Sequence, residues 1–136
     1  MSTQGYSGTP LVKKLGIKEH YTCCFMNTPE HYFDLLGQLP EIETTSQLKP
    51  NSLDFAHVFC FTLKTLKEYF PQVKPALKKN GTLWISWPKK SSKLNSDLDG
   101  NIVRTYGLSQ GLVDVKVAAI DENWSGLKFM YRLKDR

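Results

Sequence analysis

Short apolar runs recur along the chain between polar stretches that contain glycine or proline. Runs of this length that are rich in β-branched or aromatic residues are typical of buried strands. We therefore predict strands over residues 21–26, 54–61, 82–87 and 113–120. Residues 127–133 alternate apolar and polar side chains, which predicts a strand with one wetter face. A shorter alternation over residues 41–45 predicts an edge strand.

Two short helices are predicted from their boundary residues. A Thr-Pro pair opens residues 11–15 and again residues 30–36, and a glycine follows each segment. Threonine can cap the free N–H groups of a helix, proline fits the first helical position, and glycine adopts the left-handed conformation just past the end.

Two longer helices are predicted further along the chain. One runs from Thr62 to about residue 79, with a kink or a division into two helices at Pro71 and Pro75, and Asn80-Gly81 ends it. Ser96 and Asp99 have the spacing of a capping box, which predicts a second helix over residues 96–109.

Alternating strands and helices predict an α/β fold. Only six residues, 121–126, join the last two predicted strands, so these strands form an antiparallel hairpin. We expect a three-layer sandwich with a mostly parallel, Rossmann-like sheet of five to six strands and an antiparallel C-terminal strand. We also expect residues 1–136 to form a single domain, with residues 1–20 as an N-terminal segment that packs on the sheet edge.

Composition narrows the class of protein. The chain has 136 residues, 40% of them hydrophobic and 23% charged, which argues against disorder. No apolar run approaches the ~20 residues of a membrane span, and the N-terminal residues lack the apolar segment of a signal peptide. We therefore expect a cytoplasmic protein that does not contact a membrane. The net charge of +5 permits an anionic partner but does not identify one.

Ligands of open parallel sheets bind beyond the carboxyl ends of the strands. Helix N-termini at this edge attract anions, and Lys89 would reinforce the attraction. Tyr6 joins the candidates because the N-terminal segment could fold over this edge. The predicted ligand-binding residues are Asn27, Thr28, Phe61, Trp87, Lys89, Lys90, Asp121, Glu122, Trp124, Ser125 and Tyr6.

The tryptophans and lysines among these residues also have a purely structural interpretation. The two tryptophans can simply cover the sheet edge, and the lysines can form a solvated loop. Cys23, Cys24 and Cys60 are interpreted as small core residues, and mid-strand His57 as a core or sheet-face residue. No metal-binding spacing and no catalytic motif is visible, so we predict no metal site and assign no catalytic residue.

Residues 77–88 (LKKNGTLWISWP) resemble the fifth-strand region of class I S-adenosylmethionine (SAM) methyltransferases. Residues 53–55 (LDF) resemble the start of the fourth strand in that family, and the two last predicted strands resemble its closing hairpin. The resemblance implies a shortened methyltransferase-like fold.

The whole chain also resembles a short, uncharacterised bacterial family known as a domain of unknown function. The resemblance implies a compact methyltransferase-like protein, but no established activity. It rests on residues 5–11 (GYSGTPL), 13–17 (KKLGI), 86–90 (SWPKK), 111–116 (GLVDVK) and 121–129 (DENWSGLKF).

The region that would hold the cofactor departs from the methyltransferase pattern. Residues 25–30 (FMNTPE) contain none of the glycines that let the family's backbone approach SAM, and Glu43 is the only candidate for the acid that binds the ribose. We therefore predict a non-catalytic binding module for a small anionic ligand or a protein partner, with no cofactor. The alternative is a SAM-dependent methyltransferase with a degenerate cofactor loop. Nucleic acid is not expected, because the lysines are dispersed, and the oligomeric state stays open.

Overall fold

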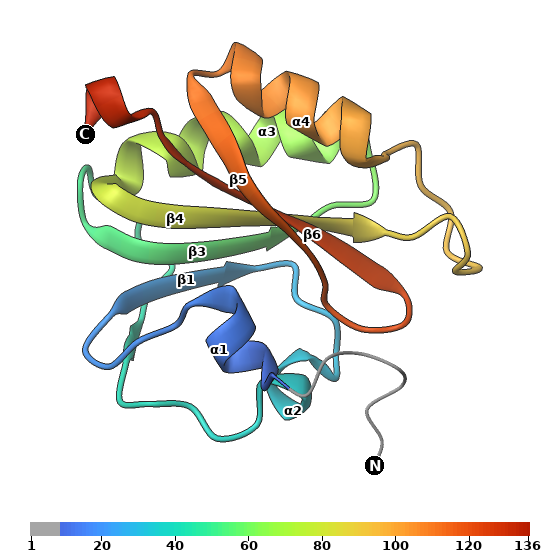
Figure 1. The fold of residues 1–136 in the computed structure, drawn as a ribbon, viewed down its shortest axis with the longest axis horizontal. Helices are drawn as coiled ribbons and strands as arrows, with labels where there is room; N and C mark the ends of the chain where they lie inside the picture. Colours follow the sequence, from blue (N-terminus) through green and yellow to red (C-terminus); the bar gives the residue numbers. More distant parts are fainter. Residues whose placement is uncertain (1–8) are drawn as a thin grey trace.

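A computed structural model describes residues 9–136, so Tyr6 lies outside the described residues. Six strands form one sheet in the order β2-β1-β3-β4-β6-β5 (Figure 1). Their bounds are Thr22–Met26 (β1), Glu43–Thr44 (β2), Leu53–Phe59 (β3), Leu77–Pro88 (β4), Leu112–Ala119 (β5) and Trp124–Tyr131 (β6). Neighbours among the first four strands pair in parallel, whereas β6 is antiparallel to both β4 and β5. The predicted sheet, with its antiparallel C-terminal strand, is confirmed.

Helices cover both faces of the sheet, which confirms the three-layer arrangement (Figure 1). One face carries the two short helices α1 and α2, and the other carries the longer helices α3 and α4. The bounds are Leu11–Leu15 (α1), Tyr32–Leu36 (α2), Leu63–Val73 (α3) and Gly100–Ser109 (α4), with 3-10 turns at Lys74–Ala76 and Leu133–Asp135. No helix within residues 9–136 is both long and apolar enough to cross a membrane.

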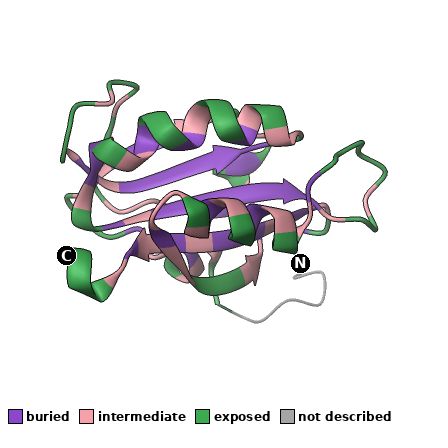
Figure 2. Cartoon of the chain, turned by 90° about the horizontal axis from the view of Figure 1, so that it is seen from above, coloured by how far each residue is buried: buried purple, intermediate pink, exposed green. Residues whose placement is uncertain are grey.

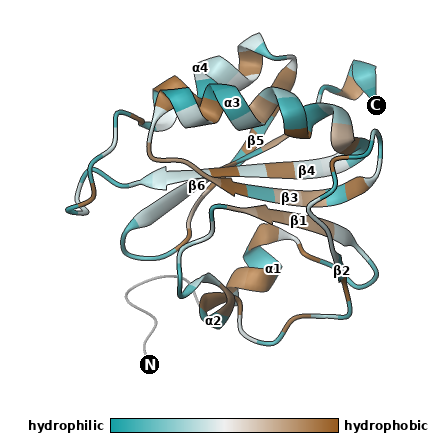
Figure 3. Ribbon diagram, turned by 180° about the vertical axis from the view of Figure 1, so that it is seen from behind, coloured by the Kyte–Doolittle hydropathy of each residue, from teal (hydrophilic) through white to brown (hydrophobic). Residues whose placement is uncertain are grey.

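The hydrophobic core is split by the sheet into two parts. Beneath α3 and α4, the fully buried side chains of Leu66, Phe70 and Phe129 pack against the central strands. On the other face, the indole N–H of Trp84 donates a hydrogen bond of 2.9 Å to the carbonyl of Leu15, which ties α1 to β4. The central strands are buried along most of their length (Figure 2), and hydrophobic residues concentrate in β1, β3 and α2 (Figure 3).

α3 continues through Pro71 to Val73, so the helix is not divided at Pro71. The fully buried side chains of Phe70 and Val73 hold this last turn against the sheet, and their burial offsets the one backbone hydrogen bond that proline removes. The α-helix then gives way to a 3-10 turn over Lys74–Ala76, which contains Pro75, so the predicted division into two helical segments falls here.

Residues 77–79, predicted to be helical, are the first residues of β4. Leu77 pairs with Leu53, and the register between β3 and β4 then shifts before Thr82. Gly81 lies at this irregularity, where a Cβ atom would approach the Leu53 carbonyl to 2.8 Å. A glycine here therefore permits close backbone approach rather than ending a helix.

The predicted start of the last helix at Ser96 is also wrong. α4 begins at Gly100, and the Asp99 side chain caps it by accepting a hydrogen bond from the Ile102 N–H. The Ser96 hydroxyl instead accepts from the Leu98 N–H and donates to the Phe61 carbonyl, which holds the preceding loop against the end of β3.

Candidate functional site

The carboxyl ends of β1, β3 and β4 and the turn between β5 and β6 lie at one edge of the sheet, which we call the carboxyl edge. Two hydrogen bonds join its parts. The Asn27 side-chain amide donates to the Phe59 carbonyl at 3.3 Å, and the Lys89 N–H donates to the Asn123 carbonyl at 2.8 Å. The loop after β1 is thus tied to the end of β3, and the end of β4 is tied to the β5–β6 turn.

The chain turns sharply where β1 ends. Asn27 has a φ of 57°, in the left-handed region that glycine usually occupies. Asparagine tolerates this conformation better than other non-glycine residues. The loop thus makes its turn without the glycines whose absence led to the prediction that no cofactor binds.

A pocket of about 330 Å³, the β1–β2 pocket, opens at the carboxyl ends of β1 and β2. The rings of Phe25 and Phe33 meet edge to face at 5.2 Å, and Phe33 is 46% exposed. Hydroxyl side chains supply the polar part of the wall. The lining residues are Phe25, Thr28, Phe33, Thr44, Thr45 and Ser46. Aromatic rings next to hydroxyl groups suit a nucleoside, which has a flat base and a polar sugar.

A second pocket of about 330 Å³, the β1–β3 pocket, lies between the ends of β1 and β3 and helix α3. It is lined by Asn27, Phe59, Phe61, Thr65, Glu68 and Tyr69. Asn27 lines this pocket and the next residue, Thr28, lines the β1–β2 pocket. The two pockets therefore adjoin at the turn after β1.

The two predicted site tryptophans lie on opposite faces of the sheet. Trp87 is buried in the core beneath α3 and α4, whereas Trp124 is buried on the side of α1 and α2. The Trp124 ring lies 5.1 Å from the ring of Phe59 and 5.2 Å from that of Phe61, so it supports the wall of the β1–β3 pocket. The tryptophans do not form one surface.

The remaining predicted residues are dispersed along the carboxyl edge. Lys90 and Glu122 are exposed, and Lys89 and Ser125 are half-buried. None of these four lines either pocket. Their role in ligand binding stays a prediction, as it does for Tyr6.

Asp121 is buried, and it pairs with a residue that the sequence did not single out. Its Oδ2 atom lies 2.7 Å from Nε2 of His31, in the turn before α2. The two residues are 90 positions apart, and no local motif links them. Only the folded arrangement of the β5–β6 turn over the loop after β1 brings them together.

His57, in contrast, is a structural residue in the core, in agreement with its interpretation from the sequence. It is fully buried in β3, where its Nδ1 atom lies 2.7 Å from the Tyr32 hydroxyl and its Nε2 atom lies 2.7 Å from the Ser86 hydroxyl. Burial lowers the pKa of His57 from 6.5 to about 3, so the ring is neutral at physiological pH.

The cysteines are also core residues. Burial, with a smaller contribution from the nearby Asp54 carboxylate, raises the pKa of Cys23 to about 12, and burial alone raises that of Cys60 to about 12. Thiols with such a high pKa carry almost no thiolate, the nucleophilic form.

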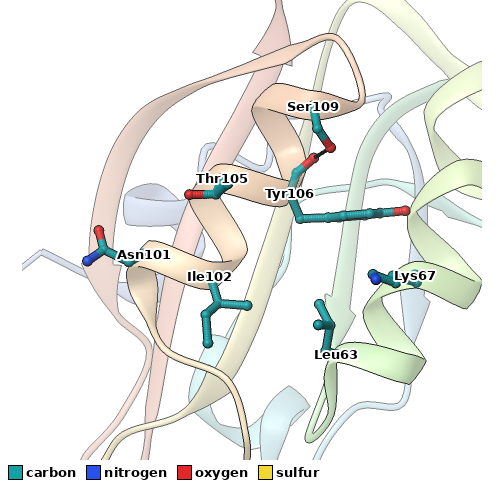
Figure 4. A pocket seen from close by; sticks show the side chains of 7 residues that line it. All are labelled: Leu63, Lys67, Asn101, Ile102, Thr105, Tyr106 and Ser109. Atoms are coloured by element: carbon teal, nitrogen blue, oxygen red, sulfur yellow. Dashed lines mark hydrogen bonds between the residues drawn. The ribbon is translucent and has the colours of Figure 1, made fainter.

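A larger hollow of about 380 Å³ lies between α3 and α4. Figure 4 shows the Tyr106 side chain lying across it, with Ile102 and Leu63 below. The surface that faces the hollow is almost entirely apolar, although four of the lining residues are polar: Lys67, Asn101, Thr105 and Ser109. It brings no group of chemical interest together, so it is not the candidate site.

No protein-family model matches the sequence, and neither does any curated protein. Solved structures do match. A SAM-dependent methyltransferase from Aquifex aeolicus superposes with a TM-score of 0.58 at 17% identity, over 90% of this chain and 88% of that chain. This chain has the fold of the SAM-dependent methyltransferases. The predicted resemblance to a bacterial family of unknown function stays a prediction.

Two further methyltransferases were solved with ligands. One is the 1,6-didemethyltoxoflavin-N1-methyltransferase from Burkholderia thailandensis with S-adenosylhomocysteine (SAH), with a TM-score of 0.58, 10% identity, and coverage of 88% of this chain and 73% of that one. The other is the magnesium protoporphyrin IX methyltransferase from Synechocystis with SAM, with a TM-score of 0.56, 8% identity, and coverage of 90% and 74%.

These neighbours contradict two predictions made from the sequence. A non-catalytic binding module was the preferred function and a cofactor was not expected, yet the three matching structures described above are methyltransferases, one named as SAM-dependent and two solved with SAH or SAM. Both predictions rested on the missing glycines, and Asn27 makes the sharp turn after β1 without one. The methyltransferase alternative is the better-supported one.

Proposed function

We propose that this protein is a SAM-dependent methyltransferase that holds its cofactor in the β1–β2 pocket. One observation carries the proposal. In a methyltransferase-like sheet, the carboxyl ends of the two strands expected to hold SAM form a pocket of about 330 Å³ with aromatic and hydroxyl walls.

The pocket residues divide into two groups by their chemistry. Phe25 and Phe33 offer ring surface to the adenine base, since aromatic contacts with a flat ring are favourable. The hydroxyls of Thr44 and Thr45 lie at the carboxyl end of β2 and would bond the ribose hydroxyls. Glu43, the one candidate for the acid that binds the ribose in the family, is not among the lining residues. Neutral hydroxyls bond less strongly than a carboxylate, so we expect micromolar rather than tighter affinity.

The chemistry itself comes from the cofactor, since SAM supplies an electrophilic methyl group on a positively charged sulfur. The chain's own contribution is to bind and orient. The rings of Phe59, Phe61 and Tyr69 surround the adjoining β1–β3 pocket and would exclude water from a methyl acceptor placed there. Asn27 precedes Thr28 of the β1–β2 pocket, and its hydrogen bond to the Phe59 carbonyl holds the turn after β1 against the wall of the β1–β3 pocket.

Calorimetric titration with SAH tests the proposal. Phe33→Ala removes a half-exposed ring from the pocket and should weaken SAH binding about ten-fold. Thr44→Val keeps the side-chain shape but removes the hydroxyl, and should weaken binding roughly three- to ten-fold. Val115→Ala is the matched control, because Val115 is equally exposed (46%) but lies on β5, outside the pocket. Equal SAH affinity in wild type and all three variants would reject this pocket as the cofactor site.

A further inference from the structure

The pair formed by His31 and Asp121 is held rigidly by the fold. One carboxylate oxygen of Asp121, Oδ1, accepts hydrogen bonds from the Asn123 N–H at 2.8 Å and the Trp124 N–H at 2.9 Å. The other oxygen, Oδ2, is thereby aimed at Nε2 of His31, 2.7 Å away. The carboxylate cannot rotate without losing two backbone hydrogen bonds.

This arrangement selects one tautomer of neutral His31. An ionised carboxylate only accepts hydrogen bonds, so neutral His31 carries its proton on Nε2 and keeps a lone pair on Nδ1. Within residues 9–136, Nδ1 of His31 has no hydrogen-bond partner. The His31 side chain is 48% exposed, whereas that of Asp121 is 10% exposed. A buried acid thus orients an accessible basic nitrogen.

The chain neighbours of the pair contact the wall of the proposed acceptor pocket. Tyr32, which follows His31, places its ring 5.1 Å from that of Phe59. Trp124, whose N–H binds Asp121, contacts the rings of Phe59 and Phe61. The chain neighbour of His31 therefore contacts one lining residue of the β1–β3 pocket, Phe59, and that of Asp121 contacts two, Phe59 and Phe61.

We propose that His31 is the general base of the reaction and that Asp121 is its positioning residue; this inference rests on the proposed methyltransferase function. The acceptor oxygen forms a bond to the methyl carbon as the carbon–sulfur bond breaks, and that electron pair stays on sulfur. The acceptor O–H bond gives its electron pair to oxygen and its proton to Nδ1 of His31. The products are the methyl ether or ester, SAH and protonated His31.

The acceptor class follows from the need for a base. A neutral amine attacks through its own lone pair, but a hydroxyl oxygen becomes a strong nucleophile only as it loses its proton. The neighbouring surface is apolar and aromatic, since Phe61 is 44% exposed and Tyr69 lines the same pocket. The site therefore fits a hydroxyl-bearing molecule with an apolar body, for which phenol is the simplest probe.

Histidine NMR of the ¹⁵N-labelled protein shows directly which ring nitrogen of His31 carries the proton. The spectra are recorded at about pH 8, where imidazole is ordinarily neutral. The wild type should show the Nε2–H form of His31, and addition of phenol should shift the Nδ1 resonance. In Asp121→Asn, the amide oxygen still accepts the two backbone bonds while its NH₂ group faces Nε2. This change should invert the proton positions and remove the phenol shift.

Acylation by diethyl pyrocarbonate gives a second readout, because the reagent attacks the imidazole lone pair. His31 should react ~10-fold or more slowly in Asp121→Asn than in the wild type. His20 is the internal control, since it is 73% exposed, has carboxylates no closer than 3.6 Å, and should react equally in both proteins. Equal His31 rates, an Nδ1–H form in the wild type, or no phenol shift would each overturn the inference.

Titration of the same samples with SAH separates the two proposals. Unchanged SAH affinity in Asp121→Asn, together with loss of the phenol shift, supports both. If the wild type binds SAH but His31 carries its proton on Nδ1, only the assignment of His31 as the base is overturned. Absence of SAH binding in the wild type overturns the proposed function, and with it the reaction in which His31 would act.

Discussion

Buried His57 predicts a specific loss of stability in mild acid. In the folded protein its two ring nitrogens contact the hydroxyls of Tyr32 and Ser86, and burial lowers its pKa to about 3. In the unfolded chain, the pKa returns to about 6.5. Between these values only the unfolded state binds a proton at His57. Its contribution to stability is therefore complete above pH 6.5 and is lost as the pH falls toward 3.

The size of this loss follows from linkage. One extra proton on the unfolded state lowers the free energy of unfolding by about 1.4 kcal/mol per pH unit. Between pH 7 and pH 5, most of which lies below the unfolded pKa, His57 alone should cost the protein roughly 2 kcal/mol. Carboxylates begin to titrate at the lower end of this window, so the contribution of His57 must be isolated by mutation.

Urea unfolding of the wild type and of His57→Gln at pH 7, 6 and 5 isolates the contribution of His57 to the pH dependence of stability. The variant should be less stable at pH 7, by about 1–3 kcal/mol, because one of the two hydroxyls loses its partner. Its stability should then fall by roughly 2 kcal/mol less than that of the wild type between pH 7 and pH 5. Val115→Ala, at an exposed position with no titratable group, should keep the wild-type pH dependence. Parallel curves for wild type and His57→Gln would refute the reasoning.

Three further substitutions test the packing, each by urea unfolding. Gly107→Ala should destabilise by about 2–4 kcal/mol, because the new Cβ would overlap the Phe129 ring, and an unchanged midpoint would contradict this contact. Trp84→Phe removes the hydrogen bond to the Leu15 carbonyl and should cost about 1–3 kcal/mol, with faster amide exchange in α1 than in α4. Asp99→Ala removes the cap of α4 and should cost about 1 kcal/mol. An unchanged free energy of unfolding would contradict the assignment of Asp99 as the cap.

Much of the fold could be predicted because its signals are local. The boundaries of α1 match the Thr-Pro and glycine signals, and the closing hairpin follows from a short connection. The start of β4 could not be predicted in this way. Residues 78–80 are polar and follow a helix, and their strand conformation depends on the pairing of Leu77 with Leu53.

The carboxyl edge was predictable, but the chemistry at it was not. Strand direction brings Asn27 and Asp121 to the same edge, as expected. The partnership of Asp121 with His31 depends on how two loops fold over each other, and no sequence spacing encodes that contact. The left-handed turn at Asn27 is likewise a backbone property, which a search for glycines overlooks.

Calorimetric titration of the wild-type protein with SAH tests the central claim most directly, since the reaction product should bind any working cofactor site. We expect binding in the micromolar range that Phe33→Ala weakens about ten-fold and Val115→Ala leaves unchanged. Absence of binding at millimolar SAH would contradict the account, and would mean that this methyltransferase fold does not serve SAM chemistry.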